Sequence, residues 1–133
     1  PVVIVVEERV IVCHAWGGQG AFEVGKCRDL AALGYVGLAV DVYGKGMRGS
    51  TREENEQLMM PLIEDRGELL SRLRGSLSAL QEDARVDGDR LAAIGFCFGG
   101  LCVLDLARSG VEIDGGILQL DGVPAYQEGL MAG

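Results

Sequence analysis

The sequence predicts an α/β protein, with a mainly parallel sheet flanked by helices, folded as one domain over residues 1–133. Short apolar runs of strand length alternate with segments of helical spacing, which is typical of strand–helix–strand units. The strand candidates are apolar throughout, as parallel strands buried on both faces tend to be. Apolar residues make up 48% of the chain, enough to form a hydrophobic core.

A strand–helix–strand unit is expected in the first third. The run 9–15 predicts a buried strand that ends in a glycine-rich loop. Residues 21–33 have helical spacing, and Gly34 is a typical helix stop. The run 35–40 predicts a second buried strand that ends at Asp41.

The middle of the chain is predicted to be mostly helical. After a glycine-rich loop, Ser50 and Glu53 have the spacing of a capping box, which predicts a short helix to about residue 60. Pro61 suits the first turn of a helix, and the leucines that follow predict one running toward residue 84.

The last third predicts a turn, two strands and a helix. Asp87-Gly88-Asp89 has turn composition, and the apolar run 91–94 predicts a strand. A helix is expected from residue 98 to about residue 109, and a last strand over 116–120. Parallel strands then bring the loops after His14, Asp41, Cys97 and Leu120 to one edge of the sheet.

The most informative motif is Gly95-Phe96-Cys97-Phe98-Gly99-Gly100, which joins a predicted strand to a predicted helix. A strand, a glycine-pinched turn and a helix with a reactive side chain at the apex form a nucleophile elbow. A helix N-terminus stabilises a thiolate, so the pKa of Cys97 is expected to fall below about 8.5. The same N–H groups suit an oxyanion. The alternative is a small buried cysteine in a tight turn.

Two polar residues end predicted strands near that turn. His14, the only histidine, could act as a base or serve a structural or supporting role. Asp41 could orient a base, or its carboxylate could cap the loop that follows. The remaining cysteines, Cys13, Cys27 and Cys102, are expected to pack in the core.

Composition excludes several classes of protein. The net charge of −8 argues against binding nucleic acid or anionic membranes. No apolar run approaches the ~20 residues of a membrane span, and residues 1–6 lack the basic flank of a signal peptide. We therefore expect a cytoplasmic protein with free thiols. No C-x-x-C pair is present, and neither a metal nor a cofactor is predicted.

Three segments resemble the dienelactone hydrolase family of α/β-hydrolases: residues 14–18, 33–44 and 94–100. The resemblance implies a partial α/β-hydrolase fold and a carboxylic-ester or lactone hydrolase (carboxymethylenebutenolidase-like) acting on small molecules. It also implies Cys97 as the nucleophile, with the backbone N–H groups of Phe98 and Trp16 as oxyanion donors.

The chain departs from the family pattern in several ways. Family members carry the triad Asp and His beyond the segment matched here, and an earlier hairpin before it, so we expect a chain truncated at the C-terminus and also at the N-terminus. Ala15 stands where the best-known members have a Glu. Arg52 is the nearest candidate for the Arg that binds a substrate carboxylate.

Two other functions remain open. An incomplete sheet would leave an unpaired edge, which predicts a non-catalytic module that forms homo-oligomers through that edge. Gly18 and Gly20 after a strand, with Asp41 about 20 residues on, also fit part of a dinucleotide-binding fingerprint. Glu23 opposes that function, because its carboxylate falls near the expected pyrophosphate position.

Overall fold

The computed structural model describes residues 6–83, 86–113 and 115–119. Strands and helices alternate, with two consecutive helices in the middle. The elements are β1 Val6–Cys13, α1 Ala21–Ala32, β2 Val36–Val40, α2 Arg52–Glu64, α3 Arg66–Gln81, β3 Val86–Phe96, α4 Phe98–Arg108 and β4 Gly115–Gln119. The four strands form one parallel sheet in the order β2-β1-β3-β4. The predicted fold class is confirmed.

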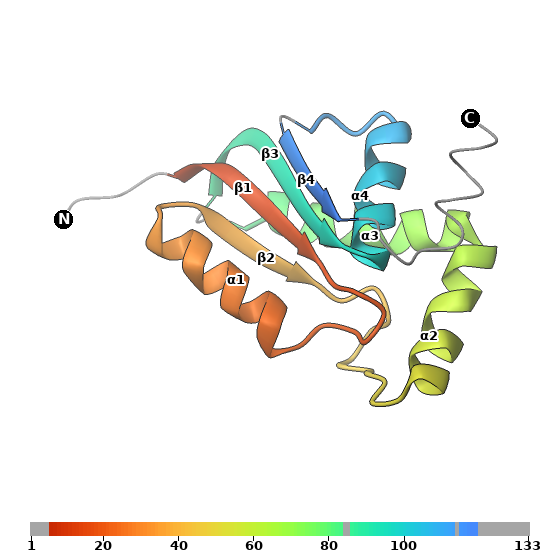
Figure 1. The fold of residues 1–133 in the computed structure, drawn as a ribbon. Coiled ribbons are helices and arrows are strands. Elements are labelled where there is room, and N and C mark those ends of the chain that lie inside the picture. The colour runs from red at the N-terminus through yellow and green to blue at the C-terminus, as the bar shows by residue number, and fades with distance from the viewer. Residues whose placement is uncertain (1–5, 84–85, 114, 120–133) are drawn as a thin grey trace.

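Helices cover the two faces of the sheet unequally. In Figure 1, α1 lies on one face beside β2, and α3 and α4 lie on the other. The main core joins that second face to α3 and α4, through side chains such as Ile11, Leu73 and Phe98. Strand β1, at the centre, has five consecutive buried residues from Arg9 to Cys13, as expected for a strand covered on both faces.

Strand β3 alternates between buried and half-buried positions. Leu91, Ala93 and Gly95 are buried, whereas Ala92, Ile94 and Phe96 are half-buried. Successive side chains of a strand point to opposite faces. Only one face of β3 is therefore well covered by the described residues.

The predicted helix boundaries in the middle of the chain were wrong. Pro61 lies inside α2 rather than starting the next helix, and the chain turns instead at Asp65, whose side chain accepts the N–H of Glu68 at the start of α3. The N-cap lies one residue later than predicted, because Thr51, not Ser50, accepts the first-turn N–H, from Glu54. These polar contacts fix both helix starts.

The expected turn at residues 87–89 was also wrong, because these residues lie within β3, although the register between β1 and β3 shifts between Val86 and Arg90. Gly34 follows the end of α1, as predicted, and its φ of +93° favours glycine. The predicted last strand is β4, although its expected end, Leu120, lies outside the described residues. Among the described residues, no helix has the length and hydropathy of a membrane span.

Candidate active site

Cys97 occupies a strained turn between β3 and α4. Its φ of +52° and ψ of −113° lie in a region that non-glycine residues rarely adopt. Such strain persists only where the surrounding structure enforces it, and it is concentrated at functional sites. The residue is half-buried rather than enclosed.

Two glycines on either side make this turn possible. A Cβ on Gly95 would lie 2.2 Å from the carbonyl oxygen of Gly99, and a Cβ on Gly99 would lie 2.1 Å from the carbonyl oxygen of Cys13. No side chain fits at those distances. The glycine spacing of the motif therefore lets α4 start directly against the end of β1.

The first turn of α4 presents backbone donors beside Cys97. Phe98 is the first helical residue, so its N–H has no acceptor within the helix. The N–H groups of Gly100 and Leu101 instead bond back to the Cys97 carbonyl, at 2.9 Å and 3.4 Å. The Phe98 N–H and the positive end of the helix therefore remain suited to an anion at this position.

An aromatic cluster links the second proposed donor, Trp16, to the elbow. The Tyr43 hydroxyl donates to the Trp16 carbonyl at 2.7 Å, and the Tyr43 ring stacks on Phe98 with centroids 5.9 Å apart. Gly99 abuts the carbonyl of His14, two residues before Trp16. The loop after β1 thus lies beside the start of α4. The Trp16 N–H makes no hydrogen bond to another described residue.

The His14 ring is buried and is fixed by hydrogen bonds at both of its nitrogens. It is 1% exposed, Nδ1 lies 2.6 Å from the Ala15 carbonyl oxygen, and Nε2 lies 3.3 Å from the Val42 nitrogen. A carbonyl only accepts and a backbone N–H only donates, so Nδ1 carries the proton and Nε2 accepts. Burial lowers the pKa of His14. Its one lone pair is already used, so the ring is poorly placed to remove a proton from Cys97.

Asp41 caps the loop after β2. Its two carboxylate oxygens accept the N–H groups of Gly44 and Gly46, each at 2.9 Å. Both contacts hold the turn that carries Val42 and Tyr43. Of the two roles expected for Asp41, the geometry fits loop capping.

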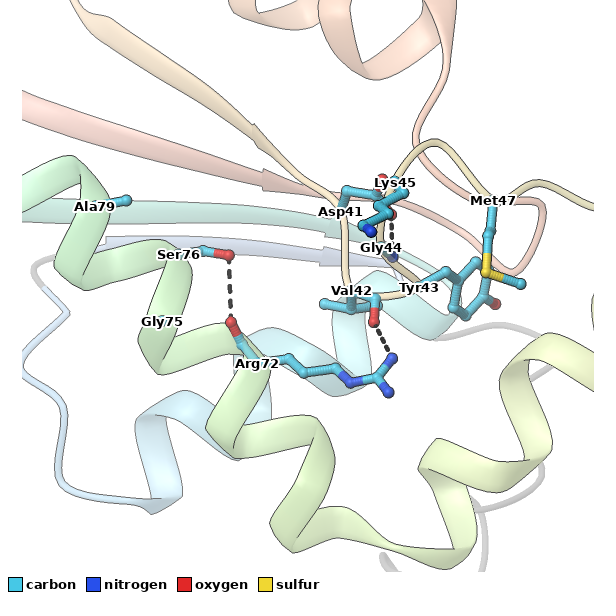
Figure 2. Close-up of a pocket in the computed structure, with 10 residues that line it drawn as sticks. All are labelled: Asp41, Val42, Tyr43, Gly44, Lys45, Met47, Arg72, Gly75, Ser76 and Ala79. Carbon is cyan, nitrogen blue, oxygen red and sulfur yellow. Dashed lines mark hydrogen bonds between the residues drawn. The ribbon is translucent and has the colours of Figure 1, made fainter.

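Figure 2 shows how α3 supports the same loop. The guanidinium of Arg72 donates to the Val42 carbonyl at 2.7 Å, while the Val42 N–H donates to His14. An open cavity of about 640 Å³ lies between this loop and α3, with Tyr43 and Met47 in its lining. Cys97 is not among the residues that line it, so this cavity is separate from the elbow.

The other three cysteines are in unreactive surroundings. Burial raises the pKa of the Cys13 thiol to about 12, and it also raises the pKa of Cys102 well above its usual value. Partial burial and the nearby charge of Glu23 raise the pKa of Cys27. Thiolate is the reactive form of cysteine, so these three thiols are held in their unreactive form near neutral pH.

Two other residues from the sequence analysis each have surroundings of their own. Arg52 is exposed in the first turn of α2 and makes no ion pair with another described residue. Glu23 is buried, and its carboxylate accepts the Gly20 N–H at the start of α1. A carboxylate therefore fills the place where a pyrophosphate would bind. Among the described residues, no cluster of metal-ligating side chains is present.

Sequence reasoning missed the residues that support the site. Tyr43 lies within a recognised segment, but its bond to Trp16 joins loops 27 residues apart in sequence. Arg72 gives no local signal, because its acceptor, the Val42 carbonyl, is 30 residues away. A tyrosine and an arginine of this kind could be found only from the arrangement of loops in space.

Comparisons with known proteins identify the family and support the fold. The dienelactone hydrolase family model matches residues 2–120. The chain is 31% identical over 101 residues to a Bradyrhizobium protein named as a probable 2-oxo-3-(5-oxofuran-2-ylidene)propanoate lactonase, covering 75% of this chain and 40% of that protein. It is 38% identical over 65 residues to the uncharacterized Caenorhabditis elegans protein K02A2.1, covering 44% and 41%.

Two solved structures are similar in fold and sequence. The structure named m3DLH has a TM-score of 0.77 at 36% identity, over 88% of this chain and 52% of its own. A dienelactone hydrolase-like promiscuous phosphotriesterase, P91, from metagenomic libraries has a TM-score of 0.76 at 32% identity, over 87% and 51%. The chain thus spans about half the length of these structures and about two-fifths of its curated relatives.

The parallel sheet and the strained cysteine between β3 and α4 define a partial α/β-hydrolase fold. The match to the family model covers most of the sequence, including the elbow and the segments that surround it. The chain belongs to the dienelactone hydrolase family.

Proposed function

We propose that this protein reacts with small esters or lactones through Cys97. The observation that carries the proposal is the backbone of Cys97, held at a positive φ by Gly95 and Gly99 at the start of α4. The family and the relative named as a lactonase support acyl substrates of this class. A reduced thiol is required, in keeping with the cytoplasmic location that we propose.

The proposed reaction begins with attack of the Cys97 thiolate on the acyl carbon. The sulfur–carbon bond forms as the carbonyl π electrons move to oxygen, and the resulting oxyanion accepts from the N–H groups of Phe98 and Trp16. Collapse expels the alcohol oxygen, which takes a proton from water, and leaves a thioester on Cys97. Water then adds to the thioester, and the thiol leaves as the carboxylic acid is released.

The weak point of this cycle is proton transfer. Both ring nitrogens of His14, the only histidine, already make hydrogen bonds. His14 is therefore unsuited to deprotonate the thiol or to activate water. Loss of a triad member lowers rates by orders of magnitude, although oxyanion donors preserve some catalysis. We therefore propose that this chain alone acylates at Cys97 but turns over weakly.

Intact-mass spectrometry after exposure to p-nitrophenyl acetate tests this proposal. One acetyl group on Cys97, located by peptide mapping, is expected, with nitrophenol release that slows after one equivalent. Cys97→Ala should lose the acetyl group, whereas Cys27→Ala should retain it and serves as the matched control. Equal acetylation of wild type and Cys97→Ala would contradict the proposal.

A second candidate function is self-association without catalysis. Within the described residues, β2 and β4 are edge strands, and the half-buried face of β3 carries Ile94 and Phe96. Exposed edges and apolar faces favour pairing with another copy. Light scattering across a concentration series would support this function by showing dimers, and a monomer at every concentration would remove it.

A further inference from the structure

We propose a second binding site, for a small organic phosphate or carboxylate, at the edge of the sheet opposite Cys97. A cavity of about 390 Å³ lies there, between the C-terminal half of α3, the middle of β1 and β3, and the segment after α4. Arg9 and Arg74 both line it. The volume falls in the range of small-ligand sites, roughly 300–1,000 Å³.

Arg9 is the residue that gives this cavity its chemistry. It is only 4% exposed, yet its guanidinium makes one hydrogen bond to another described residue, from Nε to the Arg90 carbonyl at 3.2 Å. The ion pairs among the described residues join Arg66 to Asp105 and Arg72 to Glu68. A buried charge is costly unless it is paired. An anion in the cavity would supply a counter-ion for Arg9.

Arg74 places a second cation on the same cavity. It is exposed on α3, and one terminal nitrogen donates to the Ser109 carbonyl at 3.2 Å, which ties the side chain toward the end of α4. Two guanidinium groups suit the oxygens of a carboxylate or a phosphate, because each can donate more than one hydrogen bond.

The rest of the lining defines the ligand further. Leu77 and Leu91 are buried and give the cavity an apolar floor, while Ser78 and Gln81 add polar groups. Glu112 contributes an opposing negative charge. These features favour a small anion with an apolar part, such as an aryl phosphate or carboxylate, over a free inorganic ion. Because this site lies away from the carboxyl ends of the strands, it would bind without reacting at Cys97.

The site is tested by adding phenyl phosphate or benzoate to the isotope-labelled protein at constant ionic strength and following its amide chemical shifts. Inorganic phosphate is titrated in the same way, so that its affinity shows what the phenyl ring contributes to binding. We expect saturable shifts at residues 74–81 and 111–112, with the phenyl compounds binding more tightly than inorganic phosphate. Whichever phenyl probe binds more tightly identifies the head group.

Three variants make the test specific. Arg74→Gln should weaken binding by about tenfold, because it removes a charged donor. Arg28→Gln, an equivalent change at an exposed arginine on α1, should leave binding unchanged. Glu112→Gln should tighten binding by about threefold, because it removes a repulsive charge. The proposal would be overturned if no saturable shifts are seen. That result is expected if a carboxylate of the chain already pairs with Arg9. Equal effects of Arg74→Gln and Arg28→Gln would overturn the proposal too.

Discussion

Replacing Gly99 by alanine should separate α4 from β1 and destabilise the protein. The new Cβ would lie 2.1 Å from the Cys13 carbonyl oxygen and 2.8 Å from that of His14. Carbon and oxygen in contact are normally about 3.3 Å apart or more, so the backbones must part by about 1 Å. Both neighbours are backbone atoms, which cannot rotate away. We expect a cost of about 3 kcal/mol, the upper end of typical overpacking.

Thermal unfolding followed by circular dichroism measures this cost. For a chain of this length, about 3 kcal/mol corresponds to a fall in Tm of roughly 10 °C. Gly25→Ala is the matched control, because a Cβ there meets nothing within 4 Å inside α1. Alanine in a helix interior should raise the free energy of unfolding by about 0.5–1 kcal/mol. If both variants unfold within about 2 °C of wild type, the steric reasoning is refuted.

Three further changes test the surroundings of the elbow. Because burial raises the pKa of Cys13 to about 12, its thiol ionises first in the unfolded state, so stability should be constant at low pH and fall between about pH 9 and pH 12. Urea unfolding should show a loss of about 1.4 kcal/mol between pH 8 and pH 10, reduced in Cys13→Ala. His14→Ala should lower the free energy of unfolding by about 2–3 kcal/mol, because the buried Val42 N–H loses its acceptor. An unchanged denaturation midpoint would instead favour a catalytic role for His14. Tyr43→Phe should cost about 1 kcal/mol by the same assay, because the hydrogen bond to Trp16 is lost while the ring stacking is kept; no change would show that this bond is unimportant.

The elbow could be predicted from sequence because its constraints are local. The close approach of Gly95 to Gly99 lies within six consecutive residues, and the glycine that lets α4 approach Cys13 is visible in the same motif. The parallel sheet could be predicted for a related reason, since strands buried on both faces, such as β1, are apolar throughout.

Helix boundaries were harder to predict because competing local signals were present. Pro61 suits a first helical turn, but the preceding helix continues through it, and Asp65 provides the stronger cap for the next helix. Residues 87–89 have turn composition, yet β3 continues through them with a shift in its register against β1. In both places, contacts beyond the immediate sequence decide the outcome.

The role of His14 could not be settled from sequence for a different reason. Its position at the end of a strand fits a base as well as a structural residue. The distinction depends on Val42, 28 residues away, whose N–H occupies the nitrogen that a base would need. Arg72 and Asp41 hold Val42 and its loop in place, so the outcome depends on how three segments pack.

The rate of iodoacetamide labelling at Cys97 tests the central claim most directly. Labelling at neutral pH, with peptide mapping of all four cysteines, should proceed faster at Cys97 than for N-acetylcysteine under the same conditions. Cys13 and Cys102 should remain unmodified until the protein unfolds. Labelling of Cys97 no faster than that of the free thiol would contradict the account of Cys97 as an activated nucleophile.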